Sequence, residues 1–95
     1  MEFSWDPDKN KTNRAKHGVS FETAKMVFDD PFHLSLLDRI DGGEERWKTI
    51  GQIQGVIVLI VAHTYQENNG EEVIRIISAR KATKMERKKY EERNS

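Results

Sequence analysis

The sequence predicts an α+β fold in which an antiparallel β-sheet of about four strands packs against two N-terminal helices and is followed by a basic C-terminal helix. Three observations predict this fold. Helix signals precede residue 31 and follow residue 82, whereas strand patterns succeed one another from about residue 32 to residue 80. Short turns rich in glycine and asparagine separate those strands, as they do in antiparallel meanders. The 95 residues contain no repeat and no linker and suit one domain, 1–95.

A short strand is expected in "EFSW", and the first helix is expected to begin directly after it. Asp6 is the expected N-cap, Pro7 occupies the first helical position, and Gly18 is expected to end the helix in the left-handed conformation. The helix has almost no apolar face, so core packing alone does not explain it. Four polar residues are predicted to share one side of it: Lys9, Asn13, Lys16 and His17.

The second helix is predicted over "FETAKMVFDD", with Ser20 as its N-cap. An apolar stripe places it against the core, and the stripe consists of Phe21, Ala24, Val27 and Phe28. The last helix is predicted to begin after Thr83, which forms a capping box with Glu86.

Four stretches between these helices have the patterns of strands: "FHLSLLD", "ERWKTIGQI", "VIVLIVAHTY" and "VIRIISAR". The turns between them contain "DGG", "QG" and "NNG". The third stretch is hydrophobic throughout and is expected to be a central strand that is covered on both faces. In the second, Arg46, Lys48 and Gly51 are expected on one face, with Trp47, Thr49 and Ile53 roughly opposed.

The formal net charge of zero averages two unlike parts of the chain. Residues 75–95 hold eight basic and three acidic residues, and residues 9–17 hold four lysines or arginines and no acid. Acidic residues gather at Asp29–Asp30 and from Asp38 to Glu45. This asymmetry predicts a surface for a polyanion and a separate acidic surface that faces a partner. The alternative is that these charges are solvated helix faces.

Several classes of protein are excluded by what the sequence lacks. Without cysteine there is no disulfide framework, thiolate nucleophile or zinc–cysteine cluster. No apolar leader is present at the N-terminus, and the longest apolar run, 56–62, is too short to span a bilayer. We therefore expect a soluble, cytoplasmic protein. No serine lies in a nucleophile elbow, and no histidine has metal-site spacing, so no metal and no cofactor is expected.

The residues that remain for chemistry are cations, namely Lys16, His17, Arg46, Arg75 and Arg80. Cleavage of RNA without a metal needs a base for the 2′-hydroxyl, a cation for the phosphorane and an acid for the leaving 5′-oxygen. Arginine suits the phosphate oxygens, and histidine or a lysine of lowered pKa suits the proton transfers.

Each of these residues also has a structural interpretation. His17 ends a helix, where a cation is favoured by the helix dipole. Arg46 follows two glutamates and could pair with them, and His63 ends the most buried strand and is expected to be a core histidine. Arg75 lies among isoleucines, where a cation is costly unless it faces water or a ligand. In a regular strand Arg75 and Arg80 point to opposite faces, so they converge only if the strand bulges or ends near Ser78–Ala79.

Three segments together resemble the BrnT family of type II toxins: "WDPDKNKTNRAKHGVSFETAKMVFDDP", "EERWKTIG" and "RIISARKATKMERKKYEE". The resemblance covers the chain from Trp5 to Glu92. It implies a RelE-like fold and a metal-independent endoribonuclease that cuts RNA and inhibits translation. It also implies a BrnA antitoxin with a ribbon-helix-helix part, through which the pair binds operator DNA and represses its own operon.

Carried over by position, the resemblance implies functional roles for Lys16, His17, Arg46, Arg75 and Arg80, with Glu45 and Tyr90 as further candidates. The basic last helix is expected to hold the RNA backbone. The expected RNA-binding residues are Lys9, Lys81, Lys84, Arg87, Lys88 and Tyr90. The alternatives are a nucleic-acid-binding module without catalysis and a co-repressor subunit. The first would bind RNA without cutting it, and the second would alter operator affinity only with its partner.

Overall fold

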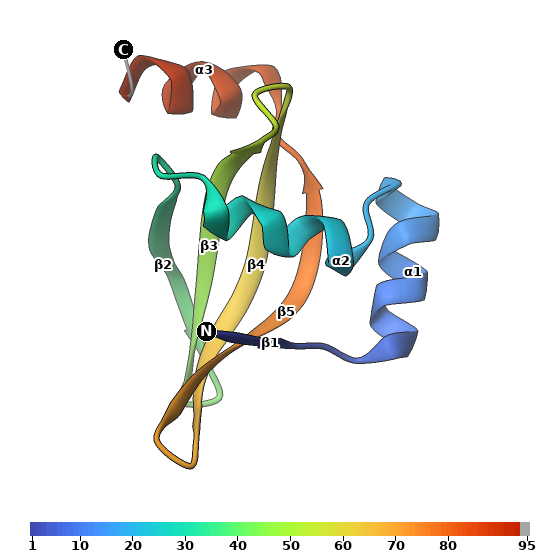
Figure 1. Cartoon of the computed structure of the whole chain (residues 1–95), viewed down its shortest axis with the longest axis vertical. Helices are drawn as coiled ribbons and strands as arrows, with labels where there is room; N and C mark the ends of the chain where they lie inside the picture. Colours follow the sequence, from blue (N-terminus) through green and yellow to red (C-terminus); the bar gives the residue numbers. More distant parts are fainter. Residues whose placement is uncertain (94–95) are drawn as a thin grey trace.

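The computed structural model describes residues 1–93 as a single sheet, with α2 over one face, α1 beside the β5 edge and α3 at one end of the strands (Figure 1). The sheet order is β1-β5-β4-β3-β2. In chain order the elements are β1 Glu2–Ser4, α1 Pro7–His17, α2 Phe21–Ala24, the 3-10 helix η1 Lys25–Asp29, β2 Leu34–Asp41, β3 Glu44–Ile53, β4 Ile57–Asn68, β5 Glu71–Lys81 and α3 Lys84–Arg93. No helix in this part of the chain is both long and apolar enough to cross a membrane.

The α+β class is confirmed, and the sheet has one strand more than expected. Strands β2 to β5 form the antiparallel meander. The short strand β1 adds a fifth, and it pairs parallel to β5 at Val73–Arg75. The sheet is therefore mixed. β1 and β5 lie at opposite ends of the chain and are not joined by a hairpin, so their pairing need not be antiparallel.

The polar helix α1 is fastened to β5 by one asparagine. Asp6 caps its start by accepting from the Asp8 amide at 2.8 Å, and Gly18 ends it at φ 70°. Asn13 is buried, and its amide donates to the backbone oxygens of Val19 and Ala79, both at 2.9 Å. Its side-chain oxygen accepts from the Ala79 N–H at 3.1 Å. These bonds to buried backbone groups explain how a helix without an apolar face is held in place.

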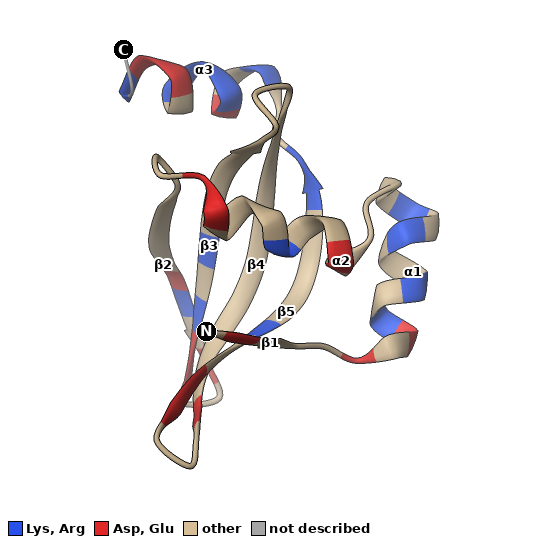
Figure 2. Ribbon diagram, in the orientation of Figure 1, with Lys and Arg blue, Asp and Glu red and all other residues tan. Residues whose placement is uncertain are grey.

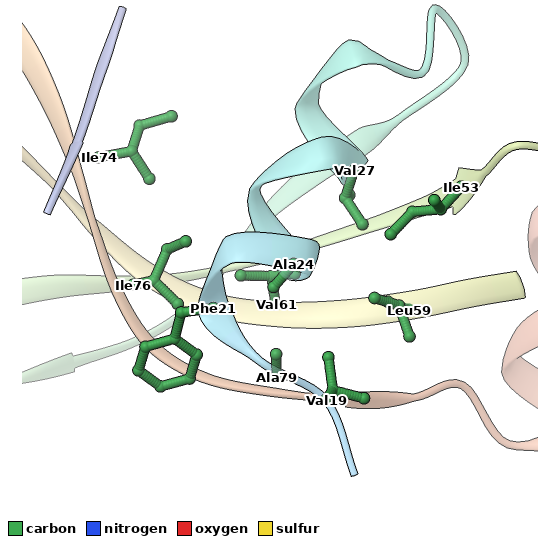
Figure 3. Packing of buried hydrophobic residues seen from close by; sticks show 10 residues of the cluster. All are labelled: Val19, Phe21, Ala24, Val27, Ile53, Leu59, Val61, Ile74, Ile76 and Ala79. Atoms are coloured by element: carbon green, nitrogen blue, oxygen red, sulfur yellow. The ribbon is translucent and has the colours of Figure 1, made fainter. Parts of the chain in front are cut away.

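The core lies between the sheet and the helical segment α2–η1 (Figure 3). The expected single helix is α-helical only to Ala24 and continues as a 3-10 helix. Its apolar side packs on Leu59 and Val61 of β4 and on Ile74 and Ile76 of β5. The full cluster comprises Val19, Phe21, Ala24, Val27, Ile53, Leu59, Val61, Ile74, Ile76 and Ala79.

Gly51 lies on this helix-covered face, so the expectation that it shares a face with Arg46 and Lys48 is wrong. It is separated from Arg46 by five positions, and alternation along a strand puts such residues on opposite faces. A Cβ at Gly51 would lie 2.6 Å from Val27 Cγ1. The glycine therefore permits the close approach of η1 to β3.

His63 is a core histidine, as expected, and is fully buried. Its Nε2 lies 2.6 Å from Thr49 Oγ1, which in turn lies 2.6 Å from Ser35 Oγ. Burial lowers the pKa of His63 to about 4 from an ordinary value of 6.5.

Because the pKa of His63 is lowered in the folded chain, we expect the free energy of unfolding to fall in mild acid. Below pH 6.5 the unfolded chain binds a proton at His63 that the folded chain binds only near pH 4, so the free energy of unfolding falls as the pH drops through that window. The shift corresponds to at most about 3 kcal/mol. Urea unfolding of the wild type and of His63→Gln, followed from pH 7.5 to pH 4.5, measures it. The wild type is expected to lose more stability than the variant, and equal losses would contradict the prediction.

Candidate functional site

The face of the sheet opposite α2–η1 carries most of the cations that the sequence singles out. We call it the cationic face. Cross-strand pairing defines its rows, because paired residues share a face. It comprises Leu34, Leu36 and Arg39 of β2, Arg46, Lys48 and Ile50 of β3, Ile60, Ala62 and Thr64 of β4, and Arg75, Ser78 and Arg80 of β5.

A bulge in β5 brings Arg75 and Arg80 to the same face. Ala62 pairs with Ser78, but the next residue of β4, His63, pairs with Ile76, so Ile77 is an extra residue. The extra residue reverses the alternation and turns Arg75, Ser78 and Arg80 toward the cationic face. The sequence required a bulge for the two arginines to converge, and the structure has this bulge at Ile77.

Arg75 is the arginine of this face with no carboxylate partner within residues 1–93. It is half-buried and lies directly across from Thr64 of β4, with Ser4 of β1 on its other side. Thr64 Oγ1 and Arg46 Nε are both buried without a hydrogen-bond partner among these residues. Buried donors without partners are uncommon and mark places where a ligand can supply the missing acceptor.

Arg46 and Lys48 both have acidic neighbours. Arg46 Nη2 lies 3.2 Å from Glu44 Oε1, and Lys48 Nζ lies 3.5 Å from Asp38 Oδ1. The pairing of Arg46 with a preceding glutamate agrees with its structural interpretation, and Glu45 points to the other face, opposite Ile40. Both pairs are partly exposed and therefore weak, so a phosphate could displace the carboxylates.

Arg80 is bound to the first turn of α3. Its two terminal nitrogens donate to the two carboxylate oxygens of Glu86 at 2.8 and 3.0 Å. Glu86 also completes the expected capping box by accepting from the Thr83 N–H at 2.8 Å. Hydrogen bonds from Arg80 lower the pKa of Glu86 to about 2, and the same bonds raise the pKa of Arg80. Arg80 therefore fastens α3 to the sheet as well as contributing charge.

Helix α1 borders the cationic face along β5. Lys9, Lys16 and His17 line a hollow of about 310 Å³ whose sheet side is Ile77 and Ser78. The predicted shared side of α1 is thus confirmed and faces the bulge. Lys16 and His17 form no ion pair within the described chain. Ser78 links the two groups, since it lines the hollow and lies between Arg75 and Arg80 on the cationic face.

The other expected RNA-binding residues are dispersed. Lys81 pairs with Leu59 and so points to the opposite face from Arg80. Lys84 and Lys88 lie exposed on α3, where Lys88 Nζ is 3.9 Å from Glu92, and Arg87 Nε is 3.7 Å from Glu91. These three remain accessible to a polyanion.

Tyr90 has a different position from the one expected. It is buried, and its hydroxyl donates to Asp30 Oδ2. Burial and this bond raise the pKa of Tyr90 to about 12. Burial alone would raise the pKa of Asp30, but the bonds from Tyr90 and from the Gln52 and Phe32 amides lower it. Tyr90 and Asp30 thus anchor α3 to the sheet, which corrects the expectation that Asp30 belongs to an acidic surface.

Charge is distributed unevenly over the molecule (Figure 2). Basic bands lie on α1 and α3 and at the end of β5, and acidic residues lie on the β4–β5 hairpin and beside the β2–β3 turn. Within residues 1–93 no group of three or more histidine, aspartate or glutamate side chains is arranged to hold a metal ion. Guanidinium, ammonium, imidazole and hydroxyl groups converge here, and they suit binding of a phosphodiester and proton transfer at its oxygens. Carboxylates also lie among them: Asp8 in the hollow, and Asp38, Glu44 and Glu86 in ion pairs on the face.

Thr64 and Ser78 are the residues of this site that sequence reasoning missed. Both are small hydroxyl residues in strands; Ser78 lies within the segment that carries the resemblance, but no feature of the sequence assigned either residue a role in the site. Only the strand register places them beside Arg75.

Comparison with known proteins identifies the class. The family description "Ribonuclease toxin, BrnT, of type II toxin-antitoxin system" matches residues 5–86. The fold is similar to the 1.1 Å crystal structure of the Brucella abortus ribonuclease toxin BrnT, with 27% identity and a TM-score of 0.67. The match covers 88% of this chain and 99% of that one. No curated protein matches the chain.

The fold and the family match define a ribonuclease toxin of a type II toxin–antitoxin system. Within that class, the chain belongs to the BrnT family. The resemblance inferred from the sequence is thereby confirmed.

Proposed function

We propose that this chain is a metal-independent endoribonuclease whose substrate lies along β5, between α1 and the cationic face. The observation that carries the proposal is the bulge at Ile77, which aligns Arg75, Ser78 and Arg80 beside the hollow lined by Lys16 and His17. A phosphodiester at Ser78 would have guanidinium groups on the sheet and proton-transfer groups on α1. The chain would act as one domain in the cytoplasm and would inhibit translation.

The proposed reaction is internal transesterification of RNA. The 2′-oxygen attacks phosphorus and forms a bond to it, the bond from phosphorus to the 5′-oxygen breaks, and a 2′,3′-cyclic phosphate and a 5′-hydroxyl result. His17 or Lys16 takes the proton from the 2′-hydroxyl, and the other returns a proton to the 5′-oxygen. Arg75 stabilises the phosphorane, with Arg46 and Arg80 on flanking oxygens.

The proposed partner is a BrnA-type antitoxin with a ribbon-helix-helix part. The pair would bind operator DNA through the antitoxin and repress its own operon. The supporting observations are the family match to type II toxins and the cations that an acidic partner segment could cover.

The proposed reaction predicts that RNA is cleaved only if the 2′-hydroxyl is present at the cleavage site. An RNA oligonucleotide with a single 2′-deoxy nucleotide at the mapped cleavage site should bind with nearly unchanged affinity and stay whole. The normal oligonucleotide should yield a 2′,3′-cyclic phosphate, detected by mass spectrometry. Cleavage of the deoxy substrate at the normal rate would rule out attack by the 2′-oxygen.

A further inference from the structure

An apolar groove of about 260 Å³ lies between α3 and the end of the cationic face formed by β2 and β3. Its floor consists of Leu34, Leu36, Ile50 and Ile60. Its walls are formed by Lys48 of β3 and by the α3 residues Glu86, Lys89, Tyr90 and Arg93. The spacing of the α3 residues is that of one helix face, so the helix presents a single continuous wall.

The groove opens at an edge of the sheet. β2 is the last strand in the sheet order, so within residues 1–93 its outer backbone groups have no neighbouring strand. Leu36 is 58% exposed although it lies beside the buried Ile60 row. An apolar side chain on an unpaired edge strand is a common place for another chain to bind.

The charges around the groove are mostly positive. Lys48, Lys89 and Arg93 surround it, although Lys48 is already paired with Asp38 at 3.5 Å. The one carboxylate that lines the groove, Glu86, is bound to Arg80 and to the Thr83 amide. The floor has no donor for a phosphate, so RNA would gain little there. A segment with apolar side chains and flanking carboxylates matches both the floor and the rim.

Acidic residues further along β2 limit where such a segment can lie. Asp38 and Asp41 follow the groove residues on β2, and Glu44 and Glu45 begin β3. They would repel a carboxylate-bearing segment from the hairpin end of β2. The groove end, at Leu34 and Leu36, is the part of this strand that is both apolar and bordered by cations.

We propose that this groove receives an apolar segment with flanking carboxylates from the cognate antitoxin. The inference rests on the proposed function for the identity of the partner. Ile60 is the cross-strand partner of Arg80, so an occupant of the groove ends beside the proposed RNA site. Its carboxylates would then compete with RNA for Arg80 and Lys48, and occupancy of the groove would inhibit cleavage.

The test compares two neighbouring leucines of β2 that point to opposite faces. Leu36 lies in the groove, and Leu37, 46% exposed, pairs with Trp47 on the other face. The probe is the antitoxin encoded beside this chain's gene, purified with an affinity tag and titrated by calorimetry. Leu36→Glu should weaken binding by about 30-fold or more, and Leu37→Glu should change it by less than about twofold.

A second variant keeps the test independent of folding defects. Lys89→Glu reverses a rim charge on the exposed surface of α3 and should weaken binding by about tenfold, more so at low salt. Lys25→Glu, on η1 and away from the groove, is its control. Unchanged antitoxin affinity in Leu36→Glu and Lys89→Glu, or no binding by the wild type, would overturn the inference.

The RNA assay separates this inference from the proposed function. Leu36→Glu should need about 30-fold more antitoxin than the wild type for half-inhibition, with the rate of each protein taken relative to its own rate without antitoxin. If the wild type cuts no RNA but Leu36→Glu still loses the antitoxin, the proposed function fails and the groove remains the docking site. If Leu36→Glu instead converts a dimer of this chain to a monomer without affecting antitoxin affinity, the occupant is a second copy and the inference is wrong.

Discussion

Replacing Arg75 with alanine is expected to slow RNA cleavage by about 10²–10³-fold while leaving the fold intact. Arg75 lies on β5, across from Thr64 of β4, and no carboxylate within residues 1–93 forms an ion pair with it. Removing it takes away a donor to the developing phosphorane charge and leaves no buried partner unsatisfied. Single-turnover cleavage of RNA measures the loss, and thermal unfolding checks the fold.

Arg39→Ala is the matched control for this variant. Arg39 also lies on the cationic face, across from Arg46, but it belongs to the edge strand β2, and its side chain is 66% exposed and lies 3.9 Å from the Asp38 carboxylate. Its removal should alter cleavage by less than about threefold. If Arg75→Ala retains the wild-type rate, the guanidinium of Arg75 has no role in cleavage. If Arg39→Ala loses as much activity as Arg75→Ala, the rate depends on overall charge and not on the position of Arg75.

Arg80→Ala is expected to have the second largest effect, for two separable reasons. It removes a cation beside the scissile phosphate, expected to slow cleavage by on the order of 10²-fold, and it releases the first turn of α3. The bidentate pair is partly exposed, so its loss should lower the free energy of unfolding by only about 1 kcal/mol.

Glu86→Gln separates the two reasons. Glutamine can still complete the capping box with Thr83, but it frees the charge of Arg80. The stability of Glu86→Gln should fall about as much as that of Arg80→Ala, whereas its cleavage rate should equal or exceed that of the wild type. Equal loss of cleavage in both variants would mean that Arg80 acts through α3 alone.

The elements that could be predicted are those whose signals are local. Asp6, Gly18, Ser20 and the Thr83–Glu86 box each act within a few residues, and the structure has all of them as expected. The apolar stripe of the second helix likewise lies against the core, as expected.

The features that could not be predicted depend on contacts between distant segments. The bulge at Ile77 exists because of how β5 pairs with β4, and nothing within "VIRIISAR" fixes which residue is extra. The bond from Tyr90 to Asp30 joins residues 60 apart, so each looked like a surface residue in the sequence. The partner of Arg80 became visible only when α3 was placed over the end of the sheet.

The measurement that tests the central claim most directly is cleavage of single-stranded RNA by the purified wild-type protein in excess EDTA, with Arg75→Ala beside it. The claim is that basic side chains of this chain, Arg75 among them, catalyse RNA cleavage without a metal ion. It predicts that the wild type cleaves at the same rate with EDTA as without it and that Arg75→Ala leaves the RNA nearly whole. RNA that stays intact in EDTA and is cut only after Mg²⁺ is restored would contradict the claim.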